Sequence, residues 1–313
     1  MGRFLAAALA AAVLAPAQQE PEPVFRVDVR LVRMLATVRS PQGALVGGLE
    51  KQDFKIFDNG VEQEIAIFER RTEQPLSIAV LVDTSRSTER ERRYEIDSIR
   101  RFLQTLLREG NEQDEAALYS FNTEVTLHTP YTRDLRRLSR GLDSLKSAGA
   151  TAMFDSIYLA AGEMKRRPGR HVVLIVSDGA DTASRVKFEE ALEALHEADA
   201  VLYAVLVTPV RSSAGRNLRG ENALSTFAQW TGGKLFMPAL GAGIDDAFAE
   251  ILRDLRTQYL LAYYPRGVSP AKERFHRVHP AATRPQHSAS ARNGYSSDDV
   301  PEPAPAGGPK RKP

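Results

Sequence analysis

The stretch LSIAVLVDTSRS, residues 76–87, decides the fold that we expect of this chain. Its first seven residues form a continuous run of apolar and small side chains, which is typical of a parallel strand covered on both faces. The run ends at Asp83, and hydroxyl side chains follow at Thr84, Ser85 and Ser87. This ending predicts that the polar side chains either cap a following helix or bind a ligand.

Strands and helices alternate along the chain from residue 75 to residue 257. Apolar runs predict further strands at 115–121, 124–130, 171–177, 201–207 and 234–238. Apolar residues at helical spacing predict helices at 96–107, 135–145, 153–166, 186–197, 221–231 and 244–258. This alternation predicts an α/β fold with a doubly wound, mostly parallel sheet.

The segments on either side of this α/β region follow a different pattern. Residues 24–38 alternate between apolar and charged side chains, and Asn59-Gly60 separates two further strand-like runs. More strands are expected at 259–265, 274–280 and 287–295. Each group is too small to form a stable sheet alone. We therefore expect one β-sandwich built from residues 24–74 and 258–296, with a domain of residues 75–257 inserted between its two parts.

The two ends of the chain are expected to lie outside these domains. Residues 4–14 form an apolar run of 11 residues behind Arg3, and small residues follow at 15–17. The run is shorter than the roughly 17 residues that a membrane-spanning helix needs. A buried helix would need a polar face, so we interpret residues 1–17 as a secretory signal, followed by a linker at 18–23. A tail rich in proline, glycine and lysine, residues 297–313, is expected to be disordered.

Composition narrows the possible functions. The chain has no cysteine, which excludes disulfides, thiol catalysis and thiolate metal sites. Its net charge is only +2, so the protein has no strong positive electrostatic field that would attract nucleic acid or an anionic membrane. A secretory signal on a chain without cysteines favours bacterial export, to the periplasm or to the extracellular space.

Oxygen-bearing side chains from three segments are expected to meet at one edge of the sheet. Asp83 and Asp178 follow two predicted strands, and Thr151 lies in a glycine-containing loop ahead of a helix. In open α/β sheets, ligands bind outside the carboxyl ends of the strands. Together with Ser85 and Ser87, these residues form an all-oxygen set suited to Mg²⁺, with Mn²⁺ or Ca²⁺ as alternatives. A carboxylate of another protein could complete the coordination of such an ion.

This residue set resembles the metal-ion-dependent adhesion site of the von Willebrand factor type A domain, and the resemblance covers residues 75–257. It implies that Ser85, Ser87 and Thr151 bind the metal through their hydroxyls. It also implies that Asp83 and Asp178 bind it either directly or through water. The flanking segments, among them VDVRLVRMLATV at 27–38, resemble the bacterial family of secreted proteins related to this domain.

Three functions are compatible with these observations. The first is a non-enzymatic adhesion or protein-interaction protein that captures an aspartate or glutamate of its partner through the metal. The second is a metal-dependent hydrolase with Asp83 or Asp178 as nucleophile or base, although no Ser-His-Asp set or glycine-rich phosphate loop accompanies them. The third is a metal-free structural scaffold, which the intact ligand set disfavours.

Five other residues carry specific expectations. Asp155 is expected on the first turn of its helix, where the helix dipole favours an acid, and Asp181 is expected just outside the ligands. His276 and His279 should point to opposite faces of a strand, and we expect both on the surface. Trp230 is expected in the core.

Overall fold

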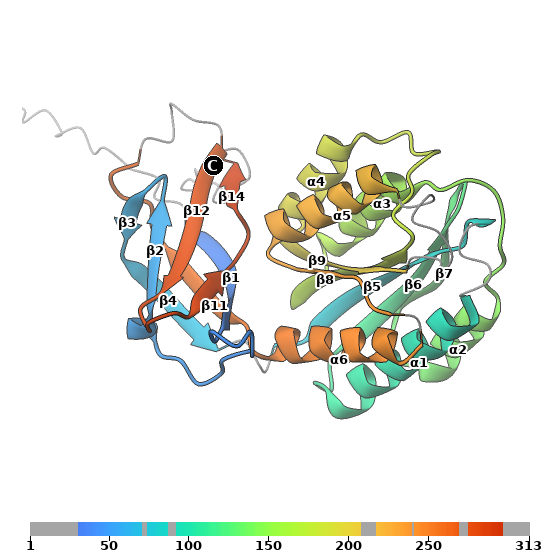
Figure 1. The fold of residues 1–313 in the computed structure, drawn as a ribbon, viewed down its shortest axis with the longest axis horizontal. Helices are drawn as coiled ribbons and strands as arrows, with labels where there is room; N and C mark the ends of the chain where they lie inside the picture. Colours follow the sequence, from blue (N-terminus) through green and yellow to red (C-terminus); the bar gives the residue numbers. More distant parts are fainter. Residues whose placement is uncertain are drawn as a thin grey trace, which may run out of the picture.

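The computed structural model describes residues 31–70, 74–86, 92–207, 217–239, 241–268 and 275–296. It contains a six-stranded sheet with helices on both faces and, beside it, two four-stranded antiparallel sheets (Figure 1). This arrangement confirms the predicted fold class. The signal, the linker, the tail and Ser87 lie outside the described residues, and the predicted domain limits remain predictions.

The six-stranded sheet has the order β10-β9-β8-β5-β6-β7. All neighbouring strands run parallel except β7, which is antiparallel to β6. Every residue of β5 and β9 is buried, as the continuous apolar runs predict. The strands are β5 (Leu76–Asp83), β6 (Glu115–Phe121), β7 (Val125–Thr132), β8 (Arg170–Ser177), β9 (Ala200–Leu206) and β10 (Leu235–Phe236).

Six helices of the described residues cover the two faces of this sheet. One face carries α1, α2 and α6, whose buried side chains belong to the same core cluster as Ile78 and Val80 of β5. The other carries α3, α4 and α5, whose buried side chains belong to a second cluster with Ala79 and Leu81 of the same strand. The helices are α1 (Arg92–Glu109), α2 (Leu135–Asp143), α3 (Met153–Met164), α4 (Phe188–Glu197), α5 (Leu218–Thr231) and α6 (Ala242–Arg256).

Both ends of the described chain contribute to the two antiparallel sheets, whose orders are β13-β1-β11-β4 and β14-β12-β2-β3. Strand β1 pairs with β11, and β2 pairs with β12, so each sheet joins strands from before and after the α/β region. The predicted Asn59-Gly60 turn joins β2 to β3, and both of its residues have positive φ, 46° and 82°. The elements are β1 (Val32–Arg39), the 3₁₀ turn η1 (Lys51–Asp53), β2 (Phe54–Asp58), β3 (Val61–Gln63), β4 (Ile65–Arg70), β11 (Tyr259–Tyr263), β12 (Phe275–Ala282), β13 (Ser288–Ser290) and β14 (Gly294–Ser296).

Two expectations about single residues were wrong. His276 is buried, with 1% of its surface exposed, because its imidazole forms a hydrogen bond with the buried Asp58 of a neighbouring strand. His279 is exposed on the opposite face of β12, as expected. Trp230 lies at the surface of α5 and is 37% exposed, because its ring stacks on Phe275 of the sandwich instead of entering the core.

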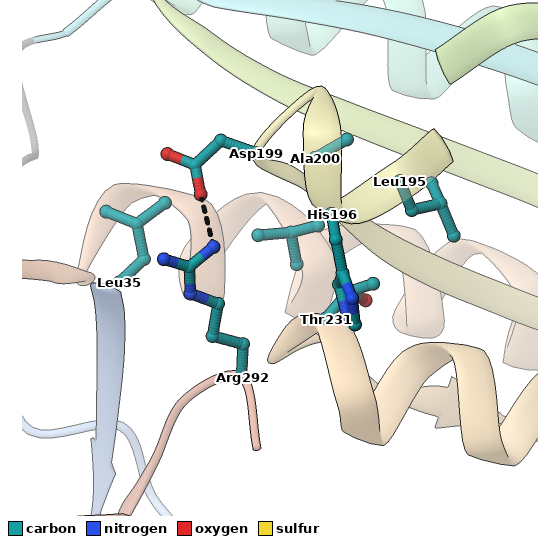
Figure 2. A pocket seen from close by; sticks show the side chains of 8 residues that line it. Leu35, Leu195, His196, Asp199, Ala200, Thr231 and Arg292 are labelled. Atoms are coloured by element: carbon teal, nitrogen blue, oxygen red, sulfur yellow. Dashed lines mark hydrogen bonds and ion pairs between the residues drawn. The ribbon is translucent and has the colours of Figure 1, made fainter. Parts of the chain in front are cut away.

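The sandwich contacts the amino-terminal edge of the parallel strands. Arg170, the first residue of β8, donates to the backbone of Leu255 near the end of α6. Arg292 of the sandwich pairs with Asp199, one residue before β9, at 3.3 Å (Figure 2). The hollow beside this ion pair measures about 10 Å³, room for one water at most. The carboxyl ends of the parallel strands therefore point away from the sandwich.

No helix within the described residues combines the length and the apolar character that crossing a membrane requires.

Candidate functional site

Asp83 is the last residue of β5, and its side chain is completely buried. One carboxylate oxygen accepts the backbone N–H of Ser85 at 2.8 Å, and the other accepts the hydroxyl of Ser177 at 2.6 Å. Burial raises the pKa of Asp83 from 3.8 to about 6, against the lowering effect of these hydrogen bonds, and the nearby charge of Asp178 raises it further. The carboxylate of Asp83 is thus shielded from solvent and lies near a second carboxylate, that of Asp178.

The turn after β5 is tied to its neighbours by backbone hydrogen bonds. The N–H of Thr84 donates to the carbonyl of Phe121 at the end of β6, at 2.9 Å. The carbonyl of Thr84 accepts the N–H of Ala148 at 3.0 Å, so the loop before α3 is fixed against the same turn. Ser85 is 2% exposed, whereas Arg86 is exposed to solvent. The turn therefore presents the serine inward and the arginine outward.

Thr151 is held by the loop that follows β8. Its N–H donates to the hydroxyl of Thr182 at 3.0 Å, and its carbonyl accepts the N–H of Thr182 at 2.8 Å and that of Ala183 at 2.9 Å. Thr151 is also buried, with 3% exposed. These bonds place the threonine beside the segment that carries Asp178.

Asp178 follows directly after β8 and is half-buried. One of its oxygens accepts the N–H of Ala180 at 3.0 Å, which closes a tight turn. The hydroxyl of Ser177, which donates to Asp83, also accepts the N–H of Gly179 at 3.0 Å. The structure thus brings Asp83, Ser85 and Asp178 together and bonds the loop of Thr151 to the same segment. Ser87 lies outside the described residues.

Two acids join α3 to the loop that follows β8. Asp155 lies on the first turn of that helix, as expected, and accepts the N–H groups of Arg185 and Val186 at 2.9 and 2.8 Å. Asp181, expected only near the ligands, accepts the N–H of Met153 at 2.8 Å and so caps the amino end of α3. The loop after β8 and the start of α3 therefore hold each other in place.

Sequence reasoning missed Ser177, which links Asp83 to the turn at Gly179. The available signal was its position, because it is the last residue of a buried strand and a hydroxyl there needs a hydrogen-bond partner. Its partner could not be read from the sequence, because Asp83 lies on another strand.

A close contact between two glycines sets the position of α5 at this edge. A Cβ atom on Gly220 would lie 1.3 Å from the carbonyl oxygen of Gly179, whose φ is +85°. We expect Gly220→Ala to destabilise the protein by about 1–3 kcal/mol, because the amino end of α5 must move away from the loop. The measurement is urea unfolding.

The matched control is Gly162→Ala on α3, where a Cβ would meet open space. That change should stabilise the protein by about 0.5–1 kcal/mol, because alanine loses less conformational entropy in a helix than glycine. Equal stability of the two variants would contradict the role assigned to the Gly179–Gly220 contact.

The donors at this edge suit a hard divalent cation. A cation between two carboxylates offsets their electrostatic repulsion, and buried hydroxyls can supply further oxygen ligands. Among the described residues, no group of three or more His, Cys, Asp and Glu side chains could hold a metal ion. A metal ion held at this edge would therefore need hydroxyl oxygens as ligands in addition to the two carboxylates.

Comparisons with known proteins agree with this fold. Residues 78–180 match the family model of the von Willebrand factor type A domain. No curated protein sequence matches the chain.

Three of the similar solved structures come from bacteria. A von Willebrand factor type A protein from Catenulispora acidiphila has 10% identity and a TM-score of 0.49, over 87% of this chain and 64% of that one. The von Willebrand factor domain of a type V pilus tip protein from Porphyromonas gingivalis has 13% identity and a TM-score of 0.48, over 58% of this chain and 95% of that one. An aerotolerance-related membrane protein from Bacteroides fragilis has 16% identity and a TM-score of 0.44, over 57% and 98%. At these values the likeness carries no conclusion about function.

Proposed function

We propose that this chain, which carries a von Willebrand factor type A domain, is an exported, non-enzymatic adhesion or protein-interaction protein that works in the periplasm or outside the cell. The single observation that carries the proposal is the buried carboxylate of Asp83. It lies beside the charge of Asp178 at the carboxyl edge of the sheet. A buried charge beside a second charge of the same sign is unfavourable unless a cation joins them.

The residues that would hold the cation are Asp83, Ser85, Ser87, Thr151 and Asp178. When bound, Mg²⁺, or Mn²⁺ or Ca²⁺ in its place, supplies a position at which a carboxylate of a partner protein can replace a water. The chain keeps its own ligands in place through the hydrogen bonds from Ser177 to Asp83 and from Thr182 to Thr151. No proton transfer or bond cleavage is needed for this role.

The test is a calorimetric titration of the purified protein with Mg²⁺ and Mn²⁺, with Thr151→Val as the variant. Valine keeps the shape of threonine and removes only the hydroxyl, so we expect metal affinity to fall roughly tenfold or more. The matched control is Thr126→Val on the exposed edge strand β7, which should bind the metal like the wild type.

Two results would contradict the proposal. Absence of heat with wild-type protein and either cation would favour the metal-free scaffold. Turnover of a panel of phosphoesters by the metal-loaded protein would favour the hydrolase.

A further inference from the structure

A groove of about 570 Å³ runs between α1 and α2, which lie side by side on one face of the sheet (Figure 1). Three exposed arginines line it, Arg108 from the last turn of α1 and Arg136 and Arg140 from α2. Gly110, just after α1, lies against the side chain of Arg256 at the end of α6. The carboxyl end of α1 is therefore near the sandwich, so this groove is separate from the candidate metal site.

The three positive charges of the groove are offset only in part within the described part of the chain. Other arginines of these helices have partners: Arg100 pairs with Asp143 and Arg101 with Asp245, each at 2.8 Å. No described carboxylate lies within ion-pair distance of the three groove arginines. The one acid in the lining is Asp134, whose carboxylate caps α2 by accepting the N–H groups of Arg136 and Arg137. These hydrogen bonds, together with the charges of Arg136 and Arg140, lower the pKa of Asp134, so this single carboxylate faces three arginines.

The spacing of the arginines determines which ligand fits the groove. Arg136 and Arg140 are four residues apart on α2, so they share one face and lie about 6 Å apart along the helix axis. In an extended chain, side chains two residues apart point the same way and lie about 6.6 Å apart. Two alternate carboxylates of an extended segment therefore match two successive arginines, and guanidinium groups bind carboxylates through paired hydrogen bonds.

We propose that this groove binds an acidic segment of a partner protein, in extended conformation and with carboxylates at alternate positions. Arg136 and Arg140 bind successive carboxylates, and Arg108 faces them from α1. The hydroxyl of Ser139 and the amide of Gln104, which also line the groove, can bind the backbone of the segment. This surface works without a metal and is independent of the site at Asp83.

The probe is a fluorescein-labelled peptide Gly-Glu-Ala-Glu-Ala-Glu-Gly, and its binding to the full-length protein is measured by anisotropy at low salt. We expect binding that weakens as salt is added and that persists in excess EDTA. The double variant Arg136→Gln, Arg140→Gln should bind the peptide about tenfold more weakly, and glutamine preserves the helix. Arg108→Gln, a separate change on α1, should weaken binding as well.

The matched control is Arg137→Gln, because Arg137 is an exposed arginine of the same helix that does not line the groove. Its affinity for the peptide should stay within about twofold of the wild type. The proposal is overturned by equal weakening in the control and the double variant, by absence of binding to wild type, or by loss of binding in EDTA. Tighter binding of inorganic triphosphate than of the peptide would also overturn it, because the ligand would then be a phosphate.

Discussion

Replacing Asp83 by asparagine should abolish Mg²⁺ binding and, at the same time, make the metal-free protein more stable at pH 8. The two effects have one cause, because the buried carboxylate is unfavourable without a cation and necessary with one. Asparagine has nearly the same shape. Its oxygen can still accept from Ser85, and its amide can donate to the hydroxyl oxygen of Ser177, which reverses the wild-type hydrogen bond.

The pH dependence follows from the raised pKa of Asp83. Its folded value is about 6 and its ordinary value is 3.8, so between these values the folded chain holds a proton that the unfolded chain has lost. Stability therefore falls as pH rises through this window, and the loss is complete above about pH 6. At about 1.4 kcal/mol per pKa unit, the loss amounts to about 3 kcal/mol in the metal-free wild type. Asp83→Asn should not show it.

The measurement is urea unfolding between pH 4 and pH 8 in EDTA, repeated at pH 8 with Mg²⁺. Saturating metal should stabilise the wild type, by about 2.7 kcal/mol at one hundred times the dissociation constant, and should leave Asp83→Asn unchanged. The control is Asp97→Asn, an exposed acid of α1, which should behave like the wild type throughout. If Mg²⁺ stabilised Asp83→Asn as much as the wild type, the metal would bind elsewhere.

Replacing Asp58 by asparagine should destabilise the protein by about 3 kcal/mol or more. Asp58 is completely buried in the sandwich and accepts three hydrogen bonds, from His276 Nδ1 at 3.0 Å, from the Tyr263 hydroxyl at 2.8 Å and from the Tyr295 hydroxyl at 3.0 Å. A carboxylate can satisfy all three donors because it only accepts. An asparagine presents its NH₂ group to at least one of them, which leaves a buried donor without an acceptor.

The measurement is again urea unfolding. The matched change is Tyr295→Phe within the same cluster, which consists of Asp58, Tyr263, His276 and Tyr295. That variant removes one donor and leaves the carboxylate two partners, so a loss of only about 1 kcal/mol is expected. A loss below 1 kcal/mol for Asp58→Asn would show that the cluster contributes little to the folded state. The cluster joins β2 to three strands from beyond the α/β region, so it links the two parts of the sandwich.

Local patterns in the sequence determined most of the elements. The apolar run at 76–82 became β5 with every residue buried, and Asn59-Gly60 became the hairpin turn between β2 and β3. The candidate ligands could be placed at one edge because the carboxyl ends of parallel strands meet there, a rule that needs only the type and order of the elements. These features depend on residues a few positions apart, so the period of apolar side chains is enough to predict them.

Only the tertiary structure decided which polar side chains are buried and what they bind. Strand alternation shows that His276 and His279 face opposite ways, but it does not show which of them is buried. The sequence also did not reveal the partner of His276, because Asp58 is 218 residues away. Ser177 binds Asp83 across 94 residues, and Trp230 reaches the ring of Phe275 on the sandwich. A buried polar group is stable only with a partner, and partners this distant along the chain meet only when the whole fold has formed.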